Sequence, residues 1–309
     1  MEPIGAYIRR SLEIDSLSDD GLRAGLFVPA DLQGPPGIAH GGAVAALLLE
    51  GAERHARDAG GLARLPRPLR LEVTLARAVP LDTSLVAFAA RRDDGTYASR
   101  IARHDGATLA EARIAPAAAP PDAPGAARSE TSAVSAAQVP GATMCLACGS
   151  RNPRGLHLRL DYDAFHVWKH ATPPAHWRER DGSYSPALAL VLLDEIGWWL
   201  GAMACGECGL STRLAITLGE RVDAGAPLLV VGARAGVVTD DPRRRLWRSR
   251  AALLTTTDPA RPLASAEIAF AGGPGFTKSM AADLFDPADL AAARRLFPGA
   301  PVPASERDS

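Results

Sequence analysis

The chain has 309 residues, of which 47% are hydrophobic and 22% are charged, and its formal net charge is -1. This composition is typical of globular proteins, and the length is sufficient for two domains. Acidic and basic residues are interspersed along the chain, so the sequence lacks the basic stripe expected of a nucleic-acid-binding protein.

The N-terminal residues 1–20 mix acidic and basic side chains around no apolar segment, which argues against a secretory signal. The longest apolar run, Leu188–Leu193, is short for a helix that spans a bilayer, so we expect no membrane partner. Four cysteines in a long chain without a signal sequence are typical of a reducing compartment. The expected location is therefore cytoplasmic.

The first predicted core element is a helix over residues 43–50, which is almost entirely apolar and ends in an acidic residue. A helix with this pattern must be buried on most of its faces. An alternating segment follows at Leu69–Leu75, and period-two alternation predicts a strand with one buried face. Two further apolar segments, 85–90 and 109–114, are predicted to be strands of the same sheet.

The second half of the chain repeats this order. Residues 188–195 form an apolar segment with acidic residues at its end, and they can be aligned with 43–50. The alternating segment 212–218 then corresponds to 69–75, and the segments 228–233 and 263–268 correspond to the two later strands. Self-similarity of this kind predicts two copies of one structural unit.

We expect four regions along the chain. The first unit covers residues 1–118, and a linker rich in Pro and Ala covers 119–140. The second unit covers 141–275, and residues 276–309 form a short capped helix and a tail.

The predicted fold class is α+β, with a tandem pair of units in which a curled antiparallel sheet wraps around one central helix. This arrangement is the hotdog fold. A lone unit would expose a sheet edge, so the two units are expected to pair edge to edge within the chain. Such pairs can stack further, which makes a homodimer a candidate assembly.

Three segments resemble the hotdog thioesterase superfamily, of the phenylacetate-pathway and small acyl-CoA thioesterase type. Residues 37–48 contain a His-Gly-Gly sequence that opens the central helix in that superfamily. Residues 145–158 are similar to a lead-in segment of its bacterial members, and residues 192–199 resemble the end of its central helix. The resemblance spans most of residues 20–275.

The resemblance implies a site built from opposite halves of a hotdog pair. A backbone N–H at the start of one central helix polarises a thioester carbonyl, because unpaired N–H groups at a helix start stabilise developing negative charge. A carboxylate from the other helix activates water or attacks the carbonyl itself. The implied ligand is an acyl-CoA or an acyl-carrier thioester, and no cofactor is implied.

Aligning the two halves shows that each half lacks the part of the family's site that the other half keeps. His-Gly-Gly at 40–42 aligns with Ser-Pro-Ala at 185–187, and Pro186 has no N–H to donate. The carboxylate position of the family is Asp194 in the second half and Leu49 in the first. The sequence therefore predicts one composite site and one inactive counterpart.

In the predicted composite site, Gly41 N–H, together with Gly42 N–H, is the oxyanion donor, and Asp194 is the base or nucleophile. A hydroxyl at Ser211 or Thr212 orients the water, and the alignment does not choose between them. His40 supports the donor loop or touches the ligand. The simpler interpretation is that His40 shapes a turn, the glycines allow helix packing and Asp194 has a structural partner.

Two further residues are candidates for contact with the substrate. Glu50 would replace the missing carboxylate if the helix register slipped by one residue, and Trp198 would form a ligand platform. Both residue types at these positions are also compatible with a structural role.

The cysteines form two Cys-x-x-Cys pairs, Cys145/Cys148 and Cys205/Cys208. Four thiolates could bind a structural zinc ion. The gap between the pairs is much longer than in a compact zinc ribbon, so unconnected thiols are the alternative, with a redox pair as a third interpretation.

The leading functional hypothesis is hydrolysis of an acyl thioester. The alternative is a protein that binds an acyl thioester or a small ligand without turnover, since half of the sites have decayed and Ser185-Pro186 is an unusual helix start. A hotdog dehydratase or hydratase is a lesser alternative, because those enzymes resemble a pattern in which an Asp lies a few residues before a His, and Asp31 is too far from His40.

Overall fold

A computed structural model of the chain describes residues 1–300 except 19, 63, 122–135 and 274. Its first half contains two helices, one short 3-10 turn and six strands. These are α1 (Ile4–Arg10), β1 (Leu12–Ser18), β2 (Gly21–Phe27), η1 (Ala30–Leu32), α2 (Gly41–Asp58), β3 (Leu69–Leu75), β4 (Ser84–Arg91), β5 (Tyr97–Ala102) and β6 (Thr108–Pro116).

The described part of the second half has one long central helix, seven strands, three short 3-10 turns and two short C-terminal helices. Its elements are β7 (Ala137–Gln138), β8 (Asp161–Tyr162), β9 (His166–Ala171), η3 (Ala175–Trp177), α3 (Pro186–Cys205), β10 (Gly209–Leu218), β11 (Leu228–Ala233), η4 (Arg234–Gly236), β12 (Leu246–Thr255), β13 (Ala264–Gly272), α4 (Phe276–Leu284), η5 (Pro287–Asp289) and α5 (Leu290–Leu296).

All strands of the described chain belong to one antiparallel sheet, in the order β1-β2-β4-β5-β6-β3-β10-β13-β12-β11-β9-β8-β7. The halves meet where β3 pairs with β10, from Arg213 opposite Thr74 to Leu218 opposite Leu69. Each of these two strands would otherwise be the edge of its own half, so the pairing satisfies the backbone groups that an exposed edge would leave open.

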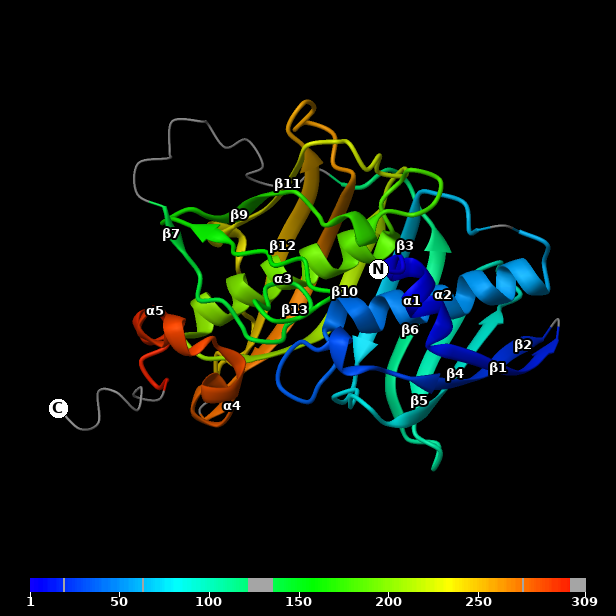
Figure 1. The fold of residues 1–309 in the computed structure, drawn as a ribbon, viewed down its shortest axis with the longest axis horizontal. Coiled ribbons are helices and arrows are strands. Elements are labelled where there is room, and N and C mark those ends of the chain that lie inside the picture. The colour runs from blue at the N-terminus through cyan, green and yellow to red at the C-terminus, as the bar shows by residue number, and fades with distance from the viewer. Residues whose placement is uncertain (19, 63, 122–135, 274, 301–309) are drawn as a thin grey trace.

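The helices α2 and α3 lie in one layer in front of the strands in the view of Figure 1. Helix α2 packs on β4, β5 and β6, and α3 packs on β10, β11, β12 and β13. The two helices also contact each other closely, since a Cβ on Gly42 would lie 2.4 Å from the carbonyl oxygen of Leu190. Only glycine allows this approach of the N-terminal turn of α2 to the backbone of α3.

Several predicted elements coincide with observed ones. The alternating segment 69–75 is β3, with inward residues buried and outward residues more exposed, and 228–233 is β11. The predicted helices are longer than expected and run over 41–58 and 186–205. The predicted C-terminal helix forms as η5 and α5, and α4 before it was not predicted. Most of the predicted linker, 122–135, lies outside the described residues.

Helix α3 is long and apolar enough to cross a membrane by length and composition alone, although the sequence run 188–193 is short. In this fold 78% of its most apolar window is buried against the sheet and α2. That is the environment of a core helix, and the burial explains its composition.

Candidate functional site

A cavity of about 210 Å³ lies where the start of α2 meets the middle of α3. Both halves of the chain line it, and its walls are largely apolar, with Ile38, Val44, Leu75, Val79, Leu284 and Phe285 among them. Most of the predicted site residues also line it: His40, Gly41, Asp194, Ser211, Thr212, Trp198, Cys145 and Cys148.

Asp194 joins the two halves at this cavity. Its Oδ2 accepts a 2.8 Å hydrogen bond from Gly42 N–H, and its Oδ1 accepts a 2.6 Å hydrogen bond from Ser211 Oγ. The His40 Nδ1 atom lies 3.1 Å from Oδ2. Burial alone would raise the pKa of Asp194, but the contacts with His40, Ser211 and Gly42 outweigh it and lower the pKa. The carboxyl is therefore held in its ionised form.

His40 is the N-terminal capping residue of α2 and is buried. Its Nε2 lies 3.4 Å from Glu195 Oε2, and its Nδ1 is 3.1 Å from both Gly42 N and Asp194 Oδ2. Burial would lower the pKa of His40, but contacts with Asp194, Cys145 and Glu195 raise it well above its ordinary value. A proton on Nδ1 is then donated to Asp194, and Gly42 N–H keeps its shorter contact with the same oxygen.

Gly41 is the first residue of α2, where backbone N–H groups have no partner within the helix. Within the described residues its N–H has no hydrogen-bond acceptor, whereas Gly42 N–H is engaged by Asp194. A Cβ on Gly41 would lie 2.7 Å from Asp194 Oδ2. Of the two predicted donors, Gly41 is therefore the one that is available to a ligand.

A β-bulge separates the roles of Ser211 and Thr212. The register of β10 against β13 shifts between Ser211 and Arg213, so Thr212 is the extra residue. Such a bulge re-aims side chains. As a result Ser211 Oγ reaches Asp194, while Thr212 Oγ1 donates a 3.2 Å hydrogen bond to the carbonyl oxygen of Ala269.

Glu195 forms a second polar centre beside Asp194. Its Oε1 accepts a 3.0 Å hydrogen bond from Trp199 Nε1, and its Oε2 faces His40 Nε2 and, at 3.8 Å, the Cys145 thiol. A hydrogen bond from Cys148 lowers the pKa of Cys145 to about 7 and leaves the pKa of Cys148 well above its ordinary value. Glu195 was not among the site residues predicted from the sequence. The signal that could have found it is the pair of adjacent acidic residues, Asp194 and Glu195, in an otherwise apolar helix.

Trp198 lines the cavity and is partly buried. Its Nε1 donates a 2.9 Å hydrogen bond to the carbonyl oxygen of Gly209, and its ring meets those of Trp199 and Phe270 edge to face. The residue therefore belongs both to the core and to the cavity wall.

The four cysteines do not come together, so the structure does not contain the four-cysteine zinc site that the sequence offered as an alternative. Cys208 N–H donates to Thr277 Oγ1 at 2.9 Å, and the Cys205 thiol packs against Gly272, both near the C-terminal end of α3. In the described part of the chain, the one group of three or more metal-binding side chains is His40, Cys145 and Glu195. The loop after α3 and the N-terminal segment of the second unit therefore do not bring the two cysteine pairs together.

Glu50 does not reach the cavity. It lies in α2, where its Oε2 is 3.8 Å from Arg9 Nη1 and its Oε1 is 3.6 Å from Arg57 Nη2. Burial raises the pKa of Glu50 to about 7. It borders a space of only about 30 Å³, which also includes Leu49 and Pro186. The substitution of Glu50 for the missing carboxylate, considered from the sequence, does not fit this position.

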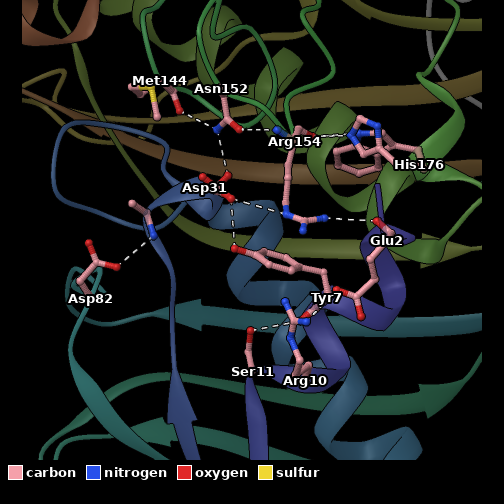
Figure 2. Close-up of polar contacts among 12 residues, drawn as sticks. Glu2, Tyr7, Arg10, Ser11, Asp31, Asp82, Met144, Asn152, Arg154 and His176 are labelled. Carbon is pink, nitrogen blue, oxygen red and sulfur yellow. Dashed lines mark hydrogen bonds and ion pairs between the residues drawn. The ribbon is translucent and has the colours of Figure 1, made fainter.

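Figure 2 shows Asn152 and Arg154 in contact with Asp31. These contacts fix the segment that carries Cys145 to the short turn η1, which precedes His40. Fully buried Asn152 donates hydrogen bonds to the carbonyl oxygens of Met144 and Asp31, at 2.8 and 2.9 Å. Arg154 lies 3.5 Å from the Asp31 carboxylate and stacks on the ring of Tyr7. These contacts cross between the halves and set the position of the cysteine segment.

No model of a known protein family matches the chain, and no curated protein matches it in sequence. Solved structures do match it. The tesB protein of Mycobacterium avium subspecies paratuberculosis is 14% identical, with a TM-score of 0.54, over 87% of this chain and 99% of the other. A protein of Novosphingobium aromaticivorans that has been assigned as a thioesterase is 17% identical, with a TM-score of 0.51, over 85% and 98%.

The dehydratase domain of PpsC from Mycobacterium tuberculosis, solved in complex with C12:1-CoA, is 15% identical. Its TM-score is 0.55, over 85% of this chain and 98% of the other. At these identities the likeness establishes the fold. The resemblance to hotdog thioesterases predicted from residues 37–48 is thus confirmed at the level of the fold, with a large antiparallel sheet and few helices.

Proposed function

We propose that this chain is a tandem double-hotdog protein that hydrolyses an acyl-CoA or acyl-carrier thioester at one composite site. The proposed units are residues 1–118 and 141–275, joined by the linker 119–140 and followed by 276–309. The observation that carries the proposal is the contact between Asp194 of the second unit and the start of α2 in the first, at a cavity lined by both. Solved structures of this fold include a protein assigned as a thioesterase and a dehydratase domain in complex with an acyl-CoA, which supports the choice of ligand.

In the proposed reaction, Gly41 N–H donates a hydrogen bond to the thioester carbonyl oxygen and stabilises the negative charge that develops on it. Asp194 takes a proton from a water molecule, whose oxygen attacks the carbonyl carbon. The carbon–sulfur bond then breaks, and the leaving sulfur takes the proton that Asp194 received, so the products are the carboxylic acid and the free thiol and Asp194 is again ionised. Direct attack by Asp194 would give an acyl anhydride that water hydrolyses to the same products.

The neighbours of Asp194 support this assignment. Three donors, from His40, Gly42 and Ser211, hold its two oxygens in a fixed orientation. A carboxylate has about four acceptor positions, so one remains for water. The lowered pKa of Asp194 keeps it ionised and able to receive a proton at neutral pH.

The counterpart site supports a single reaction centre. Pro186 is the first residue of α3 and offers no N–H there, and Leu49 stands at the carboxylate position. The space between them is small, and Arg9 of α1 crosses it to lie between Glu50 and Glu179. A substrate at this second position would have to displace α1.

Binding without turnover is the second candidate. The observation that favours it is that three hydrogen bonds hold the Asp194 carboxylate, as they would hold a carboxylate with a structural role. A dehydratase has less support, because Asp31 does not line the cavity and is paired with Arg154. We also place the protein in the cytoplasm and regard a homodimer as its candidate assembly.

The test is hydrolysis of a panel of acyl-CoA thioesters, with release of the free thiol followed for the wild type, Asp194→Asn and Glu50→Gln. Loss of general-base catalysis should lower kcat by about 10²- to 10⁴-fold in Asp194→Asn, while Glu50→Gln, which removes a remote acid of α2, should leave it unchanged. Equal turnover in Asp194→Asn would refute the assigned base. Saturable binding of an acyl-CoA without turnover would favour the second candidate.

A further inference from the structure

Three metal-binding side chains converge on the wall of the cavity. His40 Nε2 lies 3.4 Å from Glu195 Oε2, Cys145 Sγ lies 3.8 Å from the same oxygen, and the three ligand atoms lie within 4.8 Å of one another. All three side chains are buried. They come from the start of α2, the N-terminal segment of the second unit between β7 and β8, and the middle of α3.

These spacings fit a tetrahedral metal ion. Zinc binds nitrogen and oxygen at about 2.0–2.1 Å and thiolate sulfur at about 2.3 Å, so neighbouring ligand atoms around it are roughly 3.3–3.6 Å apart. The observed 3.4 Å between nitrogen and oxygen agrees with this, and the 3.8 Å between sulfur and oxygen requires only a small movement. Imidazole, thiolate and carboxylate together are a donor set that favours zinc and related transition metals.

The second polar atom of His40 and that of Glu195 each contact a neighbouring residue, which fixes the orientation of both side chains. The other ring nitrogen of His40 faces Asp194 Oδ2 at 3.1 Å, which is the carboxylate–histidine arrangement that orients ligands in metal sites. The other oxygen of Glu195 accepts the indole N–H of Trp199 at 3.0 Å. This outer layer leaves His40 Nε2 and Glu195 Oε2 facing each other and the Cys145 thiol.

We propose that His40, Cys145 and Glu195 bind one divalent transition-metal ion, with zinc the favoured occupant. The thiolate and the carboxylate would balance its two positive charges. All three residues line the cavity, so a fourth coordination position faces the space where a ligand would bind. This site differs from the four-cysteine set considered from the sequence, and it does not depend on thioester hydrolysis.

The test measures metal binding directly. Metal is removed from the full-length protein with a chelator, and Co²⁺ is added while the absorption spectrum is recorded. We expect one equivalent of Co²⁺ per chain, with intense visible bands of tetrahedral Co²⁺ and a thiolate-to-metal charge-transfer band. Zn²⁺ should displace it. Absence of saturable binding would overturn the proposal.

Variants assign the ligands. Cys145→Ser should abolish the charge-transfer band. Cys208→Ser, which removes a buried thiol just after the C-terminal end of α3, should retain it. Trp199→Phe removes the hydrogen bond behind Glu195 and should weaken Co²⁺ binding by roughly tenfold. Should Cys145→Ser fail to fold, Glu195→Gln replaces it, and an unchanged spectrum and affinity in the folded variant would overturn the assignment. Thiol release assayed in chelator reports separately on hydrolysis, so the two proposals can fail independently.

Discussion

The carboxylate of Asp194 accepts a 2.8 Å hydrogen bond from the backbone N–H of Gly42, a residue 152 positions away in the other half of the chain. The contact exists because α2 begins against the backbone of α3. It couples the geometry of the proposed site to the packing of the two central helices, so substitutions at the neighbouring glycines should separate packing from chemistry.

Gly42→Ala should destabilise the fold. The new methyl would lie 2.4 Å from the carbonyl oxygen of Leu190 and 2.6 Å from Val191 Cα, which are backbone atoms that cannot move aside cheaply. Overpacking of this kind costs about 1–3 kcal/mol. Gly41→Ala meets the Asp194 carboxylate instead, so it should lower turnover while the free energy of unfolding changes little. Urea denaturation and thiol release measure the two effects, and the reverse pattern would contradict this account.

Ser211→Ala should reduce turnover and Thr212→Val should not. Ser211 Oγ donates a 2.6 Å hydrogen bond to Asp194, and a hydrogen bond to a charged group contributes about 1.5–3 kcal/mol. Its loss corresponds to roughly a 10- to 100-fold decrease in kcat. Among the described residues the Thr212 hydroxyl bonds to the carbonyl of Ala269 on the neighbouring strand and not to Asp194, so Thr212 serves as the matched control. Equal losses in the two variants would indicate a general disturbance of β10.

The sequence predicted the strands and central helices well because their patterns are local. Alternation at 69–75 and apolar composition at 188–195 depend on which faces are buried, and burial is visible in the residue types. The choice between Ser211 and Thr212 depends on a bulge in the pairing of β10 with β13, which leaves no local signature. The meeting of Cys145 with Glu195 likewise depends on how the second unit folds back, and spacing along the chain does not record it.

Glu50 should make stability depend on pH. Its pKa is about 7 in the folded chain, raised from 4.5 mainly by burial. Below pH 4.5 the group is protonated in both states and has no effect. Between pH 4.5 and 7 the unfolded chain loses the proton first, so the fold is increasingly destabilised, and above pH 7 the cost is constant at about 3 kcal/mol.

Glu50→Gln removes this cost. The variant should therefore have a higher Tm than the wild type at pH 8.5 and nearly the same Tm at pH 4.5. Exposed Glu13→Gln is the control, and its effect on Tm should be similar at both pH values. A Glu50→Gln variant that is less stable at pH 8.5 would show that the contacts with Arg9 and Arg57 outweigh burial.

Asn152→Ala should loosen the segment that carries Cys145. The buried amide of Asn152 satisfies the carbonyl oxygens of Met144 and Asp31, one on each side of the junction between the halves. Removing it leaves two carbonyl groups without these donors, at a cost of about 1–3 kcal/mol each in the buried state. Urea denaturation should show the loss of stability.

The same contacts set Cys145 beside His40 and Glu195, so hydrogen exchange of the backbone amides around residue 146 should also accelerate in Asn152→Ala. The specific reporter is Leu146 N–H, which donates a hydrogen bond to the carbonyl oxygen of Gln33. Protection of that amide at the wild-type level would mean that Asn152 stabilises the fold without positioning the cysteine segment.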